Sequence, residues 1–304
     1  MKKILNLCPQ PFALLLLLLS IKFITSCTLK EEKIVPQNSL ERINTNCSNF
    51  GYSDTLFFKS NQATDFIVSP SNSQNGTYGG FPEGLSINPS TGVINVTMSE
   101  AGLRYKVYFV PANTTDTCFK FITISGVDYL SKIYNLDNND EIASPNYRGL
   151  NSVLPCSDDD EDDDDDNECE FDDGNDDDDG DGTGDEPPTG QEVILQGVDI
   201  DKVTGKIDLK KSIQNGALGI NPANGTSKLF RIYYRLNDNS QKALNFIDVK
   251  IHYFQTLGAI PQSLLNQIAD KNNALMVNSF STNRNARFKY SKPRPPDIIV
   301  IGYY

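Results

Sequence analysis

The chain is 304 residues long and carries 40 acidic against 27 basic side chains, a formal net charge of −13. Twenty of the acidic residues lie in one run, Asp158 to Glu186, that contains no Lys or Arg, so the rest of the chain has a formal charge of +7. A net-acidic chain lacks the basic face that neutralises phosphates, which argues against nucleic-acid binding. The run itself has too few apolar residues to offset chain entropy and is predicted to be disordered.

Residues 1–26 have the pattern of an export signal. Two lysines follow Met1, and the apolar stretch from Phe12 to Leu19 is too short for a membrane-spanning helix. The signal ends at Ile24-Thr25-Ser26-Cys27, which resembles the lipobox of bacterial lipoproteins. This resemblance implies cleavage before Cys27 and lipid modification of that residue, and two or more acyl chains give stable membrane attachment. The alternative is a secretory signal with an incidental cysteine.

Residues 27–46 are polar, lack a clear period and are predicted to form a flexible tether. Directly after the cysteine, Lys30-Glu31-Glu32 resembles the surface-export signal of some Gram-negative lipoproteins. The resemblance implies a lipid-anchored protein of the outer membrane that is displayed on the outside of the cell.

The first predicted module, residues 47–126, has the pattern of a β-sandwich. Apolar runs at 55–58 and 65–68 are bounded by Ser, Asn and Gly, and alternating strands follow near residues 104–110 and 119–125. Between them, Gly84 to Val96 reads GLSINPSTGVINV, in which Gly92 can take the positive φ of a tight turn. This segment resembles the signature of bacterial cadherin-like and immunoglobulin-like domains, which implies a fold and leaves the ligand open.

A second predicted module, residues 191–255, carries the same signature. Gly197 to Leu209 reads GVDIDKVTGKIDL, and its Gly, Ile, Thr-Gly and following Ile fall at the same spacing as in the first module. An internal repeat explains this agreement, and residues 229–236 and 243–254 supply closing strands. The predicted fold is all-β, with two immunoglobulin- or cadherin-like sandwich modules joined by a disordered acidic linker, residues 156–190.

Two segments lie outside the modules in this interpretation. Residues 127–155 form a connector. Residues 256–304 form an extension in which apolar spacing at 261–276 predicts one short helix and residues 298–301 form a last strand. Before that strand, residues 283–294 interleave basic and aromatic side chains. We interpret them as a charged edge strand, and the alternative is a surface for a polyanion or glycan.

Six cysteines are present, of which one leaves with the signal and Cys27 is the candidate for lipidation. The other four are expected to be oxidised outside the cytoplasm, and four thiols allow three pairings. We favour Cys47 with Cys118, which ties the first strand to a late strand of the first module. The second favoured pair, Cys156 with Cys169, closes a loop over the first half of the acidic run.

Residues 172–185 place Asp at alternate positions with Gly between them, similar to the calcium loops of thrombospondin type 3 repeats. The candidate calcium ligands are Asp172, Asp176, Asp178, Asp181 and Asp185. The EF-hand pattern is not met, because no Glu stands at the twelfth position between two apolar helices. The favoured interpretation is an acidic spacer that attracts counterions or lies loosely against the basic residues 283–294, and specific calcium sites are the alternative.

No catalytic signature is present. The single histidine, His252, lies in a predicted strand as a surface or edge residue, and the chain has no Gly-x-Ser-x-Gly elbow, phosphate-binding glycine loop or zinc-spaced His/Cys cluster. We therefore expect a surface protein for adhesion or for an extracellular protein or glycan ligand, and not an enzyme. The alternatives are a structural envelope spacer and a carbohydrate-binding accessory lipoprotein. Exposed aromatic platforms would favour the glycan ligand. The candidates are Tyr233, Tyr234, Tyr253, Phe288 and Tyr290.

Overall fold

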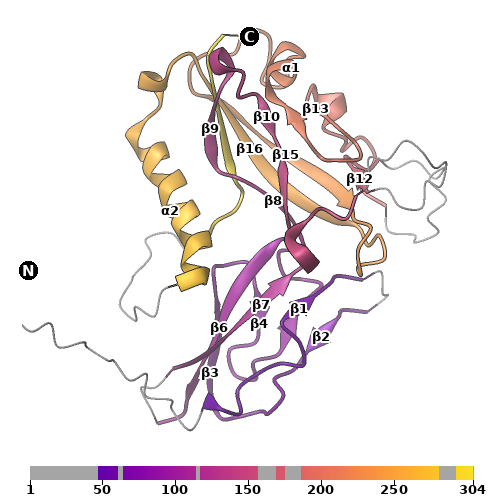
Figure 1. Cartoon of the computed structure of the whole chain (residues 1–304), viewed down its shortest axis with the longest axis vertical. Coiled ribbons are helices and arrows are strands. Elements are labelled where there is room, and N and C mark those ends of the chain that lie inside the picture. Colours follow the sequence, from indigo (N-terminus) through magenta and orange to yellow (C-terminus); the bar gives the residue numbers. More distant parts are fainter. Residues whose placement is uncertain are drawn as a thin grey trace, which may run out of the picture. The chain divides into compact units, whose positions relative to one another are not determined.

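The structure is a computed structural model that describes residues 47–60, 64–113, 117–156, 169–174, 186–280 and 292–303 (Figure 1). The predicted signal, Cys27 and the tether lie outside the described residues, as does most of the acidic run. The predicted all-β class is confirmed, because strands dominate and the described ranges contain only two α-helices. Neither helix is long and apolar enough to cross a membrane.

The first module is a sandwich of two sheets. A four-stranded sheet has the order β1-β7-β6-β3, and a three-stranded sheet has the order β2-β5-β4. The strands are β1 (Leu56–Phe57), β2 (Ile67–Val68), β3 (Gly76–Phe81), β4 (Ser86–Ile87), β5 (Ile94–Asn95), β6 (Leu103–Pro111) and β7 (Cys118–Ile124). Val68, Ile94, Tyr105 and Phe109 are among the residues from both sheets that form one core. Side chains along β6 alternate between this core and the opposite, outer face.

The second module repeats this arrangement with additions. A five-stranded sheet has the order β12-β15-β16-β17-β9, a three-stranded sheet has the order β10-β14-β13, and β8 pairs with β11. The strands are β8 (Gly126–Tyr129), β9 (Lys132–Asn135), β10 (Ile142–Ala143), β11 (Pro145–Arg148), β12 (Glu170–Phe171), β13 (Asp199–Ile200), β14 (Ile207–Asp208), β15 (Thr226–Arg235), β16 (Asn245–Phe254) and β17 (Asp297–Ile301). Ile200, Phe230 and Val249 belong to the core between the two larger sheets.

The predicted domain boundaries are wrong in the second half of the chain. Residues 127–155, expected to be a connector, supply β9 to the five-stranded sheet and β10 to the three-stranded sheet. Residues 256–304, expected to be an extension, supply β17, which lies between β9 and β16 and runs parallel to both. All five residues of β17 are buried, because an interior strand of a covered sheet packs on both faces. The second module therefore begins with β8 and ends with β17.

The acidic run does not join the two modules, as the predicted linker would. The modules meet where β7 ends at Ile124 and β8 begins at Gly126. The run instead lies on both sides of β12 in the sequence, and β12 is an edge strand of the five-stranded sheet. The run is therefore an insertion within the second module.

Polar contacts surround the point where the first module passes into the second. Ser125 and Tyr147 both donate hydrogen bonds to Asp238 Oδ2, each at 2.8 Å. Arg294 donates a hydrogen bond of 2.8 Å to the carbonyl oxygen of Val127. Arg294, predicted to lie on a solvated edge strand, is instead buried. These contacts tie the segment between β7 and β8 to the rest of the second module.

Two helices complete the second module. α1 (Leu209–Gln214) begins directly after β14, and α2 (Gln262–Phe280) covers the predicted C-terminal helix and extends beyond it. α2 packs on the outer face of the five-stranded sheet, where Ile268 joins Phe254 and Ile299 in a small apolar core (Figure 1). Beneath the helix, the buried Asp297 carboxylate binds His252 Nε2 at 2.9 Å and the Lys271 ammonium at 2.5 Å. The predicted surface or edge position of His252 is therefore wrong.

Candidate functional site

The internal repeat predicted from the sequence is also a repeat in the structure. Asn88 Oδ1 accepts hydrogen bonds from the amides two and three residues further on, and Asp201 Oδ1 does the same in the second module. Gly92 and Gly205 close the two turns with φ angles of 72° and 65°. These φ angles favour glycine because it has no Cβ.

The equivalence continues into the closing strands. Tyr78 on β3 lies opposite Phe109 on β6, and Phe171 on β12 lies opposite Tyr234 on β15. Both ring pairs are stacked, with centroids 4.5 and 5.8 Å apart. Strands β3, β6 and β7 therefore correspond to β12, β15 and β16, and their side chains can be compared position by position.

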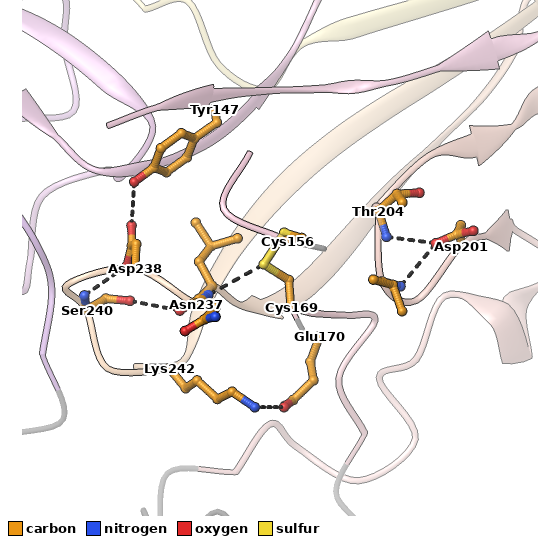
Figure 2. Close-up of a disulfide and its surroundings, with 12 residues drawn as sticks. Tyr147, Cys156, Cys169, Glu170, Asp201, Thr204, Asn237, Asp238, Ser240 and Lys242 are labelled. Carbon is orange, nitrogen blue, oxygen red and sulfur yellow. Dashed lines mark hydrogen bonds and ion pairs between the residues drawn. A yellow bond between two sulfur atoms is a disulfide. The ribbon is translucent and has the colours of Figure 1, made fainter. Parts of the chain in front are cut away.

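Both disulfides favoured from the sequence are present, Cys47–Cys118 and Cys156–Cys169. Figure 2 shows the second, which joins Cys156 and Cys169 beside the turn that follows β15. The amide of Asn237 in that turn lies 3.5 Å from Cys169 Sγ. The disulfide thus fixes where the acidic run enters the edge of the sheet.

Basic side chains of the second module hold the described part of the acidic run. The side chain of Arg235 is fully buried. Its Nε atom lies 2.9 Å from Asp173 Oδ2 and 3.6 Å from Glu170 Oε2, and its guanidinium also lies 3.9 Å from Glu186 Oε1. Lys242 also contacts Glu170, at 3.1 Å (Figure 2). These ion pairs of the run are thus with β15 and the turn after it. Most of the predicted basic partner, residues 283–294, lies outside the described chain.

Asp172, one of the candidate calcium ligands, accepts two hydrogen bonds from backbone amides of the second module. The residue is 1% exposed, and its two carboxylate oxygens accept hydrogen bonds from the amides of Val193 at 2.6 Å and Ile194 at 2.9 Å. Burial raises the pKa of Asp172, while these two hydrogen bonds act in the opposite direction. The other calcium candidates, Asp176, Asp178, Asp181 and Asp185, lie outside the described residues. Within the described ranges, no three His, Cys, Asp or Glu side chains gather as a metal site requires.

Of the three aromatic-platform candidates that the structure describes, two are not on the surface. Tyr234 and Tyr253 are buried, and only Tyr233 is partly exposed. Phe288 and Tyr290 lie outside the described residues. A glycan surface built on Tyr234 and Tyr253 is therefore ruled out, because both rings belong to the core.

Sequence reasoning missed a set of aromatic and basic side chains on the outer face of the four-stranded sheet. Lys106 on β6 lies opposite Phe81 on one side and Phe121 on the other, and Tyr108 lies opposite Phe119. Directly opposite residues project from the same side of a sheet, so these five side chains share one surface. Tyr108 and Phe119 are 36% and 44% exposed.

Three of these residues form a compact group, which we call the first ring–cation cluster: Lys106, Tyr108 and Phe119. The Lys106 ammonium lies 4.2 Å from the centre of the Phe119 ring, within the range of a cation–π interaction. The Tyr108 ring lies directly on Gly79, where an added Cβ would come within 2.2 Å of the tyrosine oxygen. The missing side chain of Gly79 therefore lets the ring lie flat on the strand.

The second module has the same kinds of side chain at the equivalent positions. This second ring–cation cluster consists of Arg231, Tyr233 and Phe246. The guanidinium carbon of Arg231 lies 4.1 Å from the centre of the Phe246 ring, and Tyr233 lies opposite Phe246 with the ring centroids 5.9 Å apart. Phe246 is 46% exposed. The fold therefore presents the same combination of tyrosine, phenylalanine and cation to solvent twice.

The two clusters differ at the position opposite the cation. Asp248 lies opposite Arg231 and accepts two hydrogen bonds from it, at 2.7 and 2.9 Å. These hydrogen bonds raise the pKa of Arg231. Phe121 takes the corresponding place opposite Lys106. Lys106 has no carboxylate partner among the described residues, and partial burial lowers the pKa of its ammonium. Within the described ranges, the first cluster thus presents a cation without a neutralising acid.

Comparison with known proteins assigns no family. No family model matches the chain, and no curated protein matches its sequence. Among solved structures, it is similar to human protocadherin-24 EC1-2 at 10% identity over 68% of this chain and 98% of that one, with a TM-score of 0.20. A SusE-like surface located polysaccharide binding protein from the Bacteroides thetaiotaomicron heparin utilisation locus matches at 10% identity over 68% of this chain and 33% of that one, with a TM-score of 0.21. Drosophila OTK extracellular domains 3–5 match at 7% identity over 67% and 61%, with a TM-score of 0.17. Likenesses at these TM-scores carry no argument about the ligand.

Proposed function

We propose that this chain is a lipid-anchored binding protein of the bacterial cell surface, attached to the outer membrane through Cys27. In this proposal, it holds an extracellular ligand on the outer sheet faces that carry the two ring–cation clusters. The observation that carries the proposal is the presence of the same exposed cluster at equivalent positions of both modules. Its role is in adhesion or ligand capture, and it is a binding protein and not an enzyme.

The composition of the clusters supports a binding role. Tyrosine and phenylalanine supply large contact areas at low cost in side-chain entropy, and aromatic residues and arginine are enriched in binding surfaces. Cross-strand pairing by itself stabilises a sheet by only about 0.2–1 kcal/mol per pair. Many kinds of residue pair give a sheet that much stability. The need for stability therefore does not explain why exposed rings lie beside a cation in both modules.

The anchor is tested by replacing Cys27 with Ala and fractionating the cells. We expect the parent in the outer membrane and the variant released, since removing the acyl chains removes the attachment. Protease added to intact cells should digest the parent if its modules face outward. A variant that stays as firmly membrane-bound as the parent would show that Cys27 is not the anchor.

The binding face is tested with the full chain in detergent on an array of immobilised polysaccharides and extracellular proteins. Tyr108→Ala and Phe119→Ala should lose signal on whatever the parent binds, by at least tenfold. Leu195→Ala is the matched control, because Leu195 is also exposed, at 71%, and lies outside the clusters. Urea unfolding shows whether each variant is still folded. Loss of binding in the control and retention in the cluster variants would refute the proposed face.

A further inference from the structure

The two ring–cation clusters are alike in shape and unlike in charge, and this difference indicates what each can bind. In the second cluster, the Arg231 guanidinium is occupied by both oxygens of Asp248. In the first cluster, Phe121 stands where that carboxylate would be. A ligand at the first cluster therefore meets an ammonium whose charge no described carboxylate neutralises, whereas a ligand at the second meets an ion pair.

A second cation–ring contact lies beside the first cluster. The guanidinium carbon of Arg104 lies 4.6 Å from the centre of the Phe121 ring, and the rings of Phe119 and Phe121 meet edge to face with centroids 5.9 Å apart. On the other side, the flat ring of Tyr108 is supported by Gly79. Rings that alternate with cations along two strands suit a ligand that itself alternates flat apolar faces with negative charge.

From this we infer that the outer face of the four-stranded sheet binds an anionic polysaccharide, and that position 121 sets this preference for charge. The inference rests on the proposed binding function and names its ligand class. A sugar ring offers C–H groups that can lie on Tyr108, and a carboxylate or sulfate on the same ring can accept a charge-assisted hydrogen bond from Lys106. The second cluster, already neutralised by Asp248, should favour neutral sugars or bind weakly.

The test measures the affinity of the full chain in detergent for polygalacturonate, with dextran as a neutral polymer and polyglutamate as an acidic polymer without sugar rings. We expect polygalacturonate to bind at least tenfold more tightly than either of the others. Lys106→Gln should remove most of this preference. Lys120→Gln is the matched control: it removes the same charge from the same sheet but at an adjacent position that faces the other way, opposite Val107.

Exchanging the residue opposite the cation is the sharper experiment. Phe121→Asp should give Lys106 a carboxylate partner and lower the affinity for polygalacturonate about tenfold, while Asp248→Phe should release Arg231 and raise it. Gly79→Ala, which changes no charge and no ring, should also weaken binding because it displaces Tyr108. Urea unfolding of each variant separates loss of binding from loss of fold.

Each contrary outcome has a distinct meaning. Equal affinity for polyglutamate would show that the face selects charge alone, and equal affinity for dextran would show that charge is irrelevant. Either result would overturn the assignment of an anionic polysaccharide as the ligand, but the proposed binding face would still stand. If Tyr108→Ala and Phe119→Ala change no interaction of the chain, the binding face itself is wrong, and the proposed function fails with it.

Discussion

Ser99 and Ser212 make the same pair of hydrogen bonds in the two modules. Each hydroxyl accepts from an amide of the first strand of the repeated hairpin, Ser86 N on β4 or Asp199 N on β13 at 2.9 Å, and donates to a carbonyl oxygen at 2.6 Å. Both serines lie 15 residues after the glycine that opens the repeated segment, Gly84 or Gly197. The repeat therefore extends beyond the hairpin of each module, as far as Ser99 in the first and Ser212 in the second.

This equivalence predicts matched energetic effects. Ser99→Ala and Ser212→Ala should each lower the free energy of unfolding by about 1–3 kcal/mol, because each leaves a backbone amide without its partner. The two residues lie in different modules, so the double variant should show the sum of the two effects. Urea unfolding measures all three variants. A large effect at one serine and none at the other would show that the two hairpins are not equivalent.

The placement of the acidic run predicts how the chain behaves when it is cut. A protease site inserted at Gly182 should be cleaved without separating the two fragments, because β12 and β9 on the first fragment pair with β15 and β17 on the second. Size-exclusion chromatography under native conditions should show one species. Two fragments that elute separately would support a linker between independent modules.

Asp172 is expected to stabilise the fold without calcium. Asp172→Asn should lower the free energy of unfolding by about 1–3 kcal/mol, because an amide cannot accept both hydrogen bonds from Val193 and Ile194. The loss should be the same in chelator and in millimolar calcium. Asp176→Asn serves as the comparison from the predicted calcium set. A loss at Asp172 that appears only with calcium would restore its predicted role as a ligand.

The buried carboxylate beneath α2 predicts a pH dependence. Burial acts to raise the pKa of Asp297, but hydrogen bonds from His252 and Lys271 outweigh it and hold the pKa below its ordinary value. The stabilisation from Asp297 is therefore present above an ordinary pKa of about 4 and is lost as the pH falls through the lower folded pKa.

Removing the partner of Asp297 should show this dependence. Lys271→Met should cost about 3–5 kcal/mol at neutral pH, because it strands a buried charge. Asp297→Asn in the same chain should recover part of the loss, and the cost of Lys271→Met alone should shrink in acid as the carboxylate takes up a proton. Unfolding curves from pH 3 to 7 test both points. A cost independent of pH would mean that the lysine acts by packing alone.

The sequence was informative about local features and misleading about distant ones. The turn from Asn88 to Gly92 depends on residues within five positions, so its repeat at Asp201 to Gly205 could be recognised. The boundaries failed because β9 and β17 pair in parallel across more than 150 residues, and an apolar strand does not reveal which sheet it joins. One signal was overlooked: Phe171 is the only aromatic residue within the acidic run, and it marks β12.

The ring–cation clusters could also have been found from the sequence. Lys106-x-Tyr108 and Arg231-x-Tyr233 share one spacing, and a phenylalanine follows on the next strand in both modules. The connecting turns, residues 112–117 and 236–244, differ in length, so a comparison without gaps does not align the phenylalanines. What the sequence could not show is the outward direction of these rings, which depends on the register of the sheets.

The most direct test of the binding face follows the ring of Tyr108 itself. NMR spectra of the full chain with 13C-labelled tyrosine rings are recorded during a titration with polygalacturonate, and Tyr108→Phe assigns the signal. Tyr105, on the same strand but buried in the core, is the internal control. We predict that the Tyr108 signal shifts and saturates while the Tyr105 signal stays in place. A Tyr108 signal that does not move when the polymer binds, or in a titration carried to the solubility limit of the polymer, would contradict the account.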